Sequence, residues 1–247
     1  MKIALIGYGK MGKEIQKIAV AQGMEVVSTI DPLAPDAMYK EIDAASLEGV
    51  DVCIDFTHPS VVVNNIKKVA KFKKNIVVGT TGWYEHEEQV RKAVNDSKIG
   101  FICATNFSLG VNIFLKIVQD AAKYFDKFPD YDVAVFEEHH NKKADSPSGT
   151  AKTTAQIILD NMERKTEMTS TTEQVRPEQL HVVGLRCGAI PGEHVVVFDS
   201  EVDTVRVSHS ARSRSGFAFG AVKAAEWIKN KKGYFTIDNM MEDIIKK

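Results

Sequence analysis

Long hydrophobic runs are missing from this chain of 247 residues. No apolar stretch approaches the roughly 18 residues that a membrane-spanning helix needs, and no apolar leader with a small-residue cleavage site opens the sequence. We therefore expect neither a membrane span nor a signal peptide. Charge of one sign is missing too, because the formal net charge is −1. This balance argues against nucleic acid or an anionic membrane as the main partner, so an acidic ligand would have to be attracted by local charge.

Cysteine is scarce: the sequence has three, Cys53, Cys103 and Cys187, with no C-x-x-C pair. Each lies in an apolar, strand-like run, where a buried reduced thiol is the simplest interpretation. The pattern argues against a disulfide framework or a zinc site and favours a reducing cytoplasm.

The first hundred residues alternate short apolar runs with helical patterns. The expected strands are 2–6, 25–30, 51–56, 75–80 and 99–103, with helices at 59–72 and 85–95. This order predicts an α/β fold with a Rossmann-type, doubly wound parallel sheet, which binds ligands at the carboxyl ends of its strands.

The pattern changes after Asn106. A helix over 110–125 precedes a strand over 132–136, and strand-like runs at 180–186, 194–199 and 204–209 follow one another without helices. They predict a second, α+β domain with a mixed or antiparallel sheet. The amphipathic segment 215–229 is expected to return to the first domain. The expected domains are thus 1–106 with 215–247 for the dinucleotide, and 107–214 for substrate binding and oligomerisation.

The first strand leads into a glycine-rich loop with the spacing G-x-G-x-x-G. Gly7 would allow the tight turn, Gly9 the close approach of a pyrophosphate, and Gly12 the packing of the next helix on its strand. Such a loop alone is weak evidence, because glycines also occur in ordinary turns. The second strand, however, ends in Asp31, where an acidic side chain would meet the adenosine ribose.

Another segment, Glu137–Ala151, combines two imidazoles, two lysines and a helix start. Imidazoles exchange protons near neutral pH, lysines stay positive, and a helix N-terminus offers free N–H groups to an anion. We infer a site for a small acidic substrate that gains or loses a proton, with His139 or Lys143 as the proton donor. His140 would bind a carboxylate.

Other interpretations of these residues remain open. His139 and His140 would point to opposite faces of a continuing strand, and the pair could simply be exposed at a strand end. A metal site with Asp145 is disfavoured, because adjacent histidines rarely bind one ion. Ser148 is either an N-cap or the edge of an anion site.

Three arginines could bind a second carboxylate or could serve solvation or subunit pairing: Arg186, Arg212 and Arg214. Of these, Arg214 is the one we assign to substrate.

These motifs together resemble the 4-hydroxy-tetrahydrodipicolinate reductase (dihydrodipicolinate reductase) family over essentially the whole chain. The segments that carry the resemblance are Gly7–Gly12, Ile54–Thr57, Gly79–Gly82, Thr105–Asn112, Glu137–Ala151, Arg186–His194 and His209–Arg214.

The resemblance implies a homotetramer that reduces a small cyclic dicarboxylate with NADH or NADPH in lysine and diaminopimelate biosynthesis. It implies His139 and Lys143 as the catalytic pair, and His140, Ser148, Gly149 and Thr150 as substrate-binding residues. The implied cofactor residues are Gly7, Tyr8, Gly9, Lys10, Met11, Gly12, Asp31, Gly79, Thr80, Thr81, Ala104, Thr105, Asn106 and Phe107.

The loop is one residue shorter than the form common in the family, and Pro32 stands where many members carry arginine. Because Asp31 would repel a 2′-phosphate, we expect NADH or dual use, with Lys10 or Lys40 as partial compensation. The alternatives are an aspartate- or homoserine-type dehydrogenase and a dinucleotide-sensing regulator without turnover.

Overall fold

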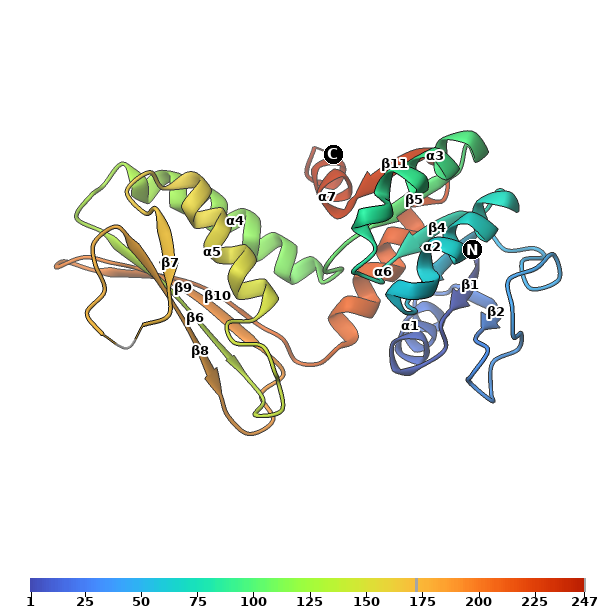
Figure 1. The fold of residues 1–247 in the computed structure, drawn as a ribbon, viewed down its shortest axis with the longest axis horizontal. Helices are drawn as coiled ribbons and strands as arrows, with labels where there is room; N and C mark the ends of the chain where they lie inside the picture. Colours follow the sequence, from blue (N-terminus) through green and yellow to red (C-terminus); the bar gives the residue numbers. More distant parts are fainter. Residues whose placement is uncertain (172, 247) are drawn as a thin grey trace. The chain divides into compact units, whose positions relative to one another are not determined.

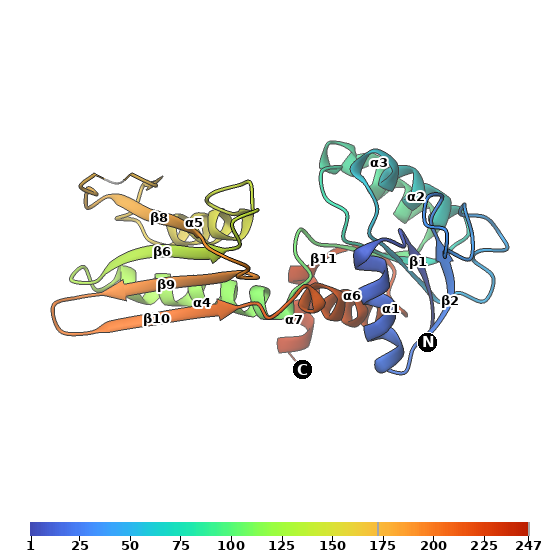
Figure 2. The same cartoon turned by 90° about the horizontal axis from the view of Figure 1, so that it is seen from below.

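The chain forms two compact units (Figures 1 and 2). A computed structural model describes residues 1–171 and 173–246, so Lys247, the last residue of the expected dinucleotide domain, lies outside the described residues. One unit comprises Met1–Leu109 and the segment that begins at Arg214, and the other comprises Gly110–Ser213. No helix among the described residues is long and apolar enough to cross a membrane.

The first unit is built on a six-stranded sheet in which neighbouring strands pair in parallel, in the order β11-β5-β4-β3-β1-β2. Its strands are β1 (Lys2–Ile6), β2 (Glu25–Ile30), β3 (Val52–Asp55), β4 (Asn75–Val78), β5 (Gly100–Cys103) and β11 (Gly233–Thr236). The strand order reverses direction at β1, which has β2 on one side and β3 on the other. Such a switch point is where parallel sheets open a crevice for ligands.

Helices cover both faces of this sheet. The elements are α1 (Lys10–Ala21), α2 (Pro59–Lys71), the 3-10 turn η1 (Tyr84–His86), α3 (Glu87–Ser97), α6 (Ser215–Ile228) and α7 (Ile237–Ile245). Successive strand residues alternate between the faces: Leu5 packs in the core with α1, α6 and α7, whereas Ala4 packs in the core with α2 and α3. The predicted doubly wound parallel sheet is confirmed.

The end of the chain adds two elements that the sequence pattern did not reveal. β11 pairs in parallel with β5, and α7 begins with a capping box in which Thr236 and Asn239 satisfy each other's backbone N–H groups. Because β11 is short and follows a lysine-rich stretch, its apolar pattern did not stand out in the sequence.

The second unit holds a mixed, five-stranded sheet in the order β10-β9-β6-β8-β7. Its elements are α4 (Leu109–Asp126), β6 (Asp132–His139), α5 (Gly149–Asn161), β7 (Glu167–Thr169), β8 (Gln179–Arg186), β9 (Glu193–Asp199) and β10 (Thr204–Ser210). β6 pairs in parallel with β8 and antiparallel with β9. The predicted mixed α+β character is confirmed.

Both helices of this unit pack on one face of the sheet (Figure 2). Val133 and Val135 of β6 point into the core beneath α4 and α5. Because side chains alternate along a strand, Glu137 and His139 continue the same face towards the end of β6. The register places His194 of β9 and Gly184 of β8 beside Glu137. Arg186 of β8 lies beside His139, so polar groups from three strands meet where the apolar core ends.

Candidate functional site

The glycine loop between β1 and α1 is sterically constrained at two of its three glycines. Gly7 has φ +86°, and a Cβ there would lie 2.3 Å from the carbonyl oxygen of Phe56. A Cβ on Gly12 would lie 2.2 Å from the carbonyl oxygen of Gly7, which explains how closely α1 approaches β1. Nothing lies within 4 Å of a Cβ built on Gly9. The outer side of the loop is thus open to a ligand.

Helix α1 begins at this open side without a capping side chain. Gly9 is its N-cap residue, and the helix has no capping hydrogen bond to a side chain within the described part of the chain. The N–H groups of that turn can therefore bind an anion. Lys10 is exposed and Met11 half-buried, while Tyr8 is buried. This geometry fits a dinucleotide pyrophosphate.

The carboxylate of Asp31 ties the glycine loop to the end of β2. One oxygen accepts a hydrogen bond from the Tyr8 N–H (2.8 Å), and the other accepts from Leu33 (2.8 Å) and Ala34 (3.0 Å). Partial burial works to raise the pKa of Asp31, but these three N–H donors outweigh it and hold the pKa below its usual value. The side chain is thus anionic at neutral pH and is held at the mouth of the loop.

A cavity of about 500 Å³ opens beside this loop at the ends of β1, β2 and β3. Its lining includes Gly7, Gly9, Asp31, Lys40, Thr57 and Lys68. It lies at the switch point of the sheet, where a dinucleotide binds in folds of this kind.

Replacing Gly12 by alanine is expected to destabilise the protein by about 1–3 kcal/mol, because the new methyl group collides with the backbone of Gly7. The matched variant Gly9→Ala has open space and should change the free energy of unfolding by less than about 0.5 kcal/mol. Urea unfolding of both variants measures the difference. Equal stability of the two would contradict this packing of α1 on β1.

A buried carboxylate organises the next two strand ends. Asp55 is 0% exposed and accepts hydrogen bonds from the hydroxyls of Thr57 (2.8 Å) and Thr80 (2.9 Å) and from the Asn65 amide (2.9 Å). Burial raises the pKa of Asp55 despite these donors. Sequence reasoning gave this residue no role, although an acid that ends a buried strand was the available signal. It joins the loops after β3 and β4.

The remaining residues expected at the cofactor occupy the ends of β4 and β5. The hydroxyl of Thr80 is turned inward to Asp55, whereas Thr81 is exposed. A Cβ on Gly79 would lie 2.2 Å from the Phe56 ring, so no larger residue fits there. In the segment after β5, Ala104 and Phe107 are buried, Thr105 is exposed and Asn106 is half-buried.

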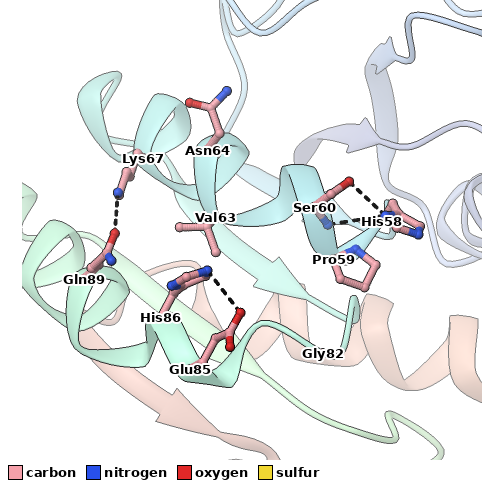
Figure 3. Close-up of a pocket in the computed structure, with 10 residues that line it drawn as sticks. All are labelled: His58, Pro59, Ser60, Val63, Asn64, Lys67, Gly82, Glu85, His86 and Gln89. Atoms are coloured by element: carbon pink, nitrogen blue, oxygen red, sulfur yellow. Dashed lines mark hydrogen bonds and ion pairs between the residues drawn. The ribbon is translucent and has the colours of Figure 1, made fainter.

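A second cavity of about 480 Å³ lies between α2 and α3 (Figure 3). Polar groups in its lining contact one another: Lys67 donates to Gln89 (2.9 Å), and a ring nitrogen of His86 lies 3.4 Å from a Glu85 oxygen. We assign it no ligand.

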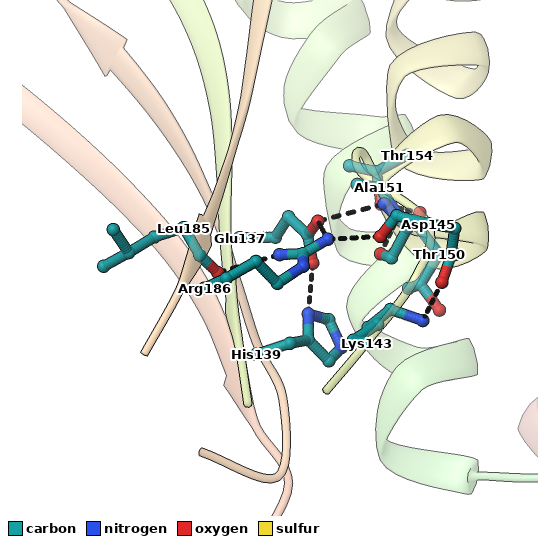
Figure 4. A network of polar contacts seen from close by, with 10 residues as sticks. Glu137, His139, Lys143, Asp145, Thr150, Ala151, Thr154, Leu185 and Arg186 are labelled. Atoms are coloured by element: carbon teal, nitrogen blue, oxygen red, sulfur yellow. Dashed lines mark hydrogen bonds and ion pairs between the residues drawn. The ribbon is translucent and has the colours of Figure 1, made fainter. Parts of the chain in front are cut away.

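The second unit contains a compact cluster around Glu137 (Figure 4). One Glu137 oxygen accepts hydrogen bonds from Arg186 Nη2 (2.7 Å) and from the Ser148 N–H (2.9 Å). The other oxygen contacts Nδ1 of His139. The His194 ring meets the His139 ring edge to face, with centroids 5.3 Å apart.

The loop after β6 brings a lysine and a helix start to the same place. Lys143 forms an ion pair with Asp145 (2.7 Å), and its side chain is 23% exposed. The Ser148 hydroxyl caps α5 by accepting from the Ala151 N–H (3.2 Å). Gly149 is exposed, with open space around it, and Thr150 is half-buried. A positive side chain and a helix N-terminus therefore flank His139.

The electrostatics of the cluster favour an ionised carboxylate beside neutral imidazoles. Burial works to raise the pKa of Glu137, but Arg186 and the Ser148 N–H hold it below its usual value. Burial lowers the pKa of His139 although Glu137 opposes this, and Lys143 lowers it further. Burial and the neighbouring His139 lower the pKa of His194 to about 4. A bound anion would raise the pKa of His139 and so favour the form that donates a proton.

The structure brings together most, but not all, of the residues expected at the substrate. His139, Lys143, Ser148, Gly149 and Thr150 surround the end of β6 and the start of α5. His140 lies just past the strand, where its carbonyl accepts from the Lys143 N–H (3.1 Å). Arg214, the exposed residue before α6, belongs to the other unit.

Sequence reasoning gave Glu137 and His194 no role and considered Arg186 for a substrate carboxylate. The structure pairs Arg186 with Glu137 instead. The spacing of Glu137 and His139, two residues apart in a strand, was a usable signal that they share a face.

Donor atoms of Glu137, His139 and His194 lie within 4.8 Å of one another, a spacing that could hold a metal ion. The guanidinium of Arg186 contacts the same carboxylate, and Lys143 adds a second positive charge. This charge opposes a cation and favours an anion.

Two family models cover nearly the whole chain. The model for the N-terminus of dihydrodipicolinate reductase matches residues 1–107, and the model for its C-terminus matches residues 110–241. The chain belongs to the dihydrodipicolinate reductase family. The 4-hydroxy-tetrahydrodipicolinate reductase of Christiangramia forsetii is 36% identical over 100% of both chains. That of Archaeoglobus fulgidus is 37% identical over 98% of this chain and 100% of its own.

A solved structure of a family member matches the fold. The dipicolinate-bound dihydrodipicolinate reductase from Paenisporosarcina sp. TG-14 has a TM-score of 0.80 and 25% identity, over 97% of this chain and 98% of its own. A probable dehydrogenase from Thermotoga maritima, at 9% identity and a TM-score of 0.57, shares the fold alone. The family uses NADH or NADPH, which agrees with the cofactor predicted from the glycine loop.

Proposed function

We propose that this chain reduces 4-hydroxy-tetrahydrodipicolinate to tetrahydrodipicolinate with NADH or NADPH, in the synthesis of diaminopimelate and lysine. The observation that carries the proposal is the cluster of Glu137, His139 and Lys143 beside the N-terminus of α5. It combines a proton-transfer group with two means of binding a carboxylate, in a chain that matches family members along its full length.

The hydroxyl group leaves as water together with a hydrogen of the adjacent ring carbon, and the unsaturated ring that results takes up one hydride and one proton. The nicotinamide supplies the hydride when the cofactor is bound. His139, in its protonated form, gives a proton to the ring as negative charge develops there, and Lys143 stabilises that charge.

The dicarboxylate would be bound by positive charge and by N–H groups. Lys143 pairs with Asp145 in the free protein, and because Asp145 is about half exposed, a substrate carboxylate can replace it at low cost. A carboxylate at the start of α5 would accept hydrogen bonds from Gly149 and Thr150, with His140 as a further donor. We assign Arg214 to the second carboxylate. The dipicolinate in the Paenisporosarcina structure is itself a cyclic dicarboxylate, which supports a substrate of this class.

We assign the cofactor to the first unit, along the glycine loop and Asp31, with the loops after β4 and β5 on the nicotinamide side. The open Gly9 and the uncapped start of α1 support this assignment. The anionic Asp31 favours a ribose with free hydroxyls over one that carries a 2′-phosphate, while Lys40 in the same cavity moderates the preference. We therefore infer use of NADH, alone or with NADPH.

We further propose a homotetramer that works in the cytoplasm. In the second unit, α4 and α5 cover one face of the sheet, and the opposite face presents Val183 and Leu185, which are 42% and 52% exposed. Apolar residues on an uncovered sheet face suit a subunit interface. Of the three free cysteines, Cys53 and Cys103 are buried as expected, whereas Cys187 is exposed. Free thiols are usual in a reducing compartment.

The proposal is tested by following NADH and NADPH oxidation with the freshly made condensation product of pyruvate and aspartate semialdehyde. Both cofactors should be oxidised only when this substrate is present, with NADH at least as effective as NADPH. Tight NADH binding without turnover would contradict the proposal and favour a dinucleotide sensor.

A further inference from the structure

Glu137 has no access to solvent, yet it contacts three functional parts of the second unit. Its side chain is 0% exposed. One oxygen accepts from Arg186 (2.7 Å) and from the N–H of Ser148 at the start of α5 (2.9 Å), while the other contacts His139. No ligand could reach this carboxylate directly, so any contribution to the reaction must act through its neighbours.

The surrounding strands leave room for this arrangement. Gly184 lies beside Glu137 on β8, and a Cβ there would come within 2.8 Å of the carboxylate and within 2.5 Å of Ser146. A buried carboxylate is costly unless each oxygen is paired, and an apolar residue would fill the same volume without that cost. Gly184 leaves space for the carboxylate and Arg186 pairs with it, so the site fits an ionised glutamate.

The His139 ring is fixed from its other side as well. Its Nε2 lies near Gly192, where a Cβ would approach to 2.9 Å, and φ is +148°. His194 meets the ring edge to face at an interplanar angle of 69°. The carboxylate contacts Nδ1, so Nε2 is the nitrogen that remains to exchange a proton with a ligand.

We propose that Glu137 is a positioning residue. It orients His139 through Nδ1, and through the Ser148 N–H it holds the start of α5 at a fixed position relative to that imidazole. The inference rests on the proposed reductase function and deepens it. One carboxylate thus sets the proton-transfer group and the carboxylate-binding helix end relative to each other. During the reaction its charge stabilises the imidazolium form of His139.

Several charged or titratable groups face His139, and they determine how its titration responds to Glu137. Glu137 opposes the loss of the imidazolium form, whereas Lys143 and Arg186 favour it. The neighbouring His194 has its own pKa lowered to about 4 and is neutral at neutral pH. His209 lies beyond His194, and Asp145 pairs with Lys143. Removing the charge of Glu137 leaves the positive neighbours unopposed, so the pKa of His139 should fall.

The test compares three variants of the full-length protein. Glu137→Gln keeps the volume and one oxygen acceptor but removes the charge, and Glu137→Asp keeps the charge. Glu138→Gln is the matched control, because Glu138 is the next residue of β6 and lies on the opposite face of the sheet. The readouts are the pH–rate profile, kcat and KM, and an NMR titration of ring-labelled histidine assigned with His139→Gln.

In Glu137→Gln, kcat should fall about 10- to 100-fold, and the alkaline limb of the pH–rate profile should move about one pH unit lower. KM for NADH should not change. Glu137→Asp should keep the wild-type position of the limb, and Glu138→Gln should behave as wild type.

A loss of kcat in Glu137→Gln with an unmoved pH profile and an unmoved His139 titration would overturn the inference, because it would show a structural role alone. The NMR titration needs no turnover. If the wild-type protein failed to reduce the substrate, the proposed function would fall, while the titration would still decide whether Glu137 controls His139.

Discussion

Replacing Lys143 by alanine is expected to lower kcat by about 10²–10⁴-fold while leaving the affinity for NADH unchanged. The ammonium group lies beside His139 in the second unit, whereas the glycine loop and Asp31 lie in the first. In the proposed mechanism, its loss removes the charge that stabilises the developing anion and binds a substrate carboxylate. KM for the dicarboxylate should therefore rise as well.

Lys142→Ala is the matched control, because it removes an equal charge from the adjacent, exposed position. It should leave kcat close to that of the wild-type protein. NADH affinity is measured by fluorescence titration and turnover by absorbance. Equal losses of turnover and of NADH binding in Lys143→Ala would contradict the catalytic role.

Replacing Arg186 by leucine is expected to lower the free energy of unfolding by about 3–5 kcal/mol at neutral pH. Arg186 donates to Glu137 (2.7 Å), to the carbonyl of Asp145 (2.5 Å) and to the carbonyl of Leu185 (2.8 Å). Its removal leaves a carboxylate that is 0% exposed without a guanidinium partner. Chemical unfolding at several pH values measures the effect.

The pH dependence of this loss of stability follows from the pKa of Glu137 in the folded wild-type protein and in the folded variant. In the wild-type protein the folded-state pKa of Glu137 is lowered. The stabilisation that the ionised Glu137 gives is therefore lost as the pH falls through that pKa. In the variant, burial without the guanidinium raises the folded-state pKa above the unfolded value, so stability is lost as the pH rises. The difference between the two proteins should therefore be largest at neutral pH and shrink in acid.

Two further variants test whether the loss of stability comes from breaking the Arg186–Glu137 pair. Arg206→Leu, at an exposed position in β10, should have little effect on stability. Adding Glu137→Gln to Arg186→Leu should restore much of the lost stability, because it removes the unpaired charge. If the double variant were no more stable than Arg186→Leu, the loss would not come from the buried charge.

The sequence was most informative where local pattern and local structure coincide. The alternation of apolar runs with helical spacing predicted the parallel sheet, since both depend on neighbouring residues. The helix start at Ser148 followed from its capping side chain, and the structure shows the expected acceptor contact.

Contacts between distant strands could not be predicted in this way. Glu137, Gly184 and His194 come together through the registers of β6 with β8 and β9, and a shift of one residue would move each to the opposite face. The sequence therefore left Arg186 open between a substrate carboxylate and solvation or subunit pairing, and it did not reveal Glu137 as its partner. The inward turn of Thr80 towards Asp55 depends in the same way on the pairing of β3 with β4.

The central claim is that a reductase reaction depends on the cluster at the end of β6. Its most direct test is NADH oxidation with fresh 4-hydroxy-tetrahydrodipicolinate, using wild type and His139→Ala in parallel, with NADH binding measured on both. The account predicts rapid, substrate-dependent turnover in the wild-type protein that collapses in the variant while NADH binding survives. Undiminished turnover in His139→Ala would contradict it.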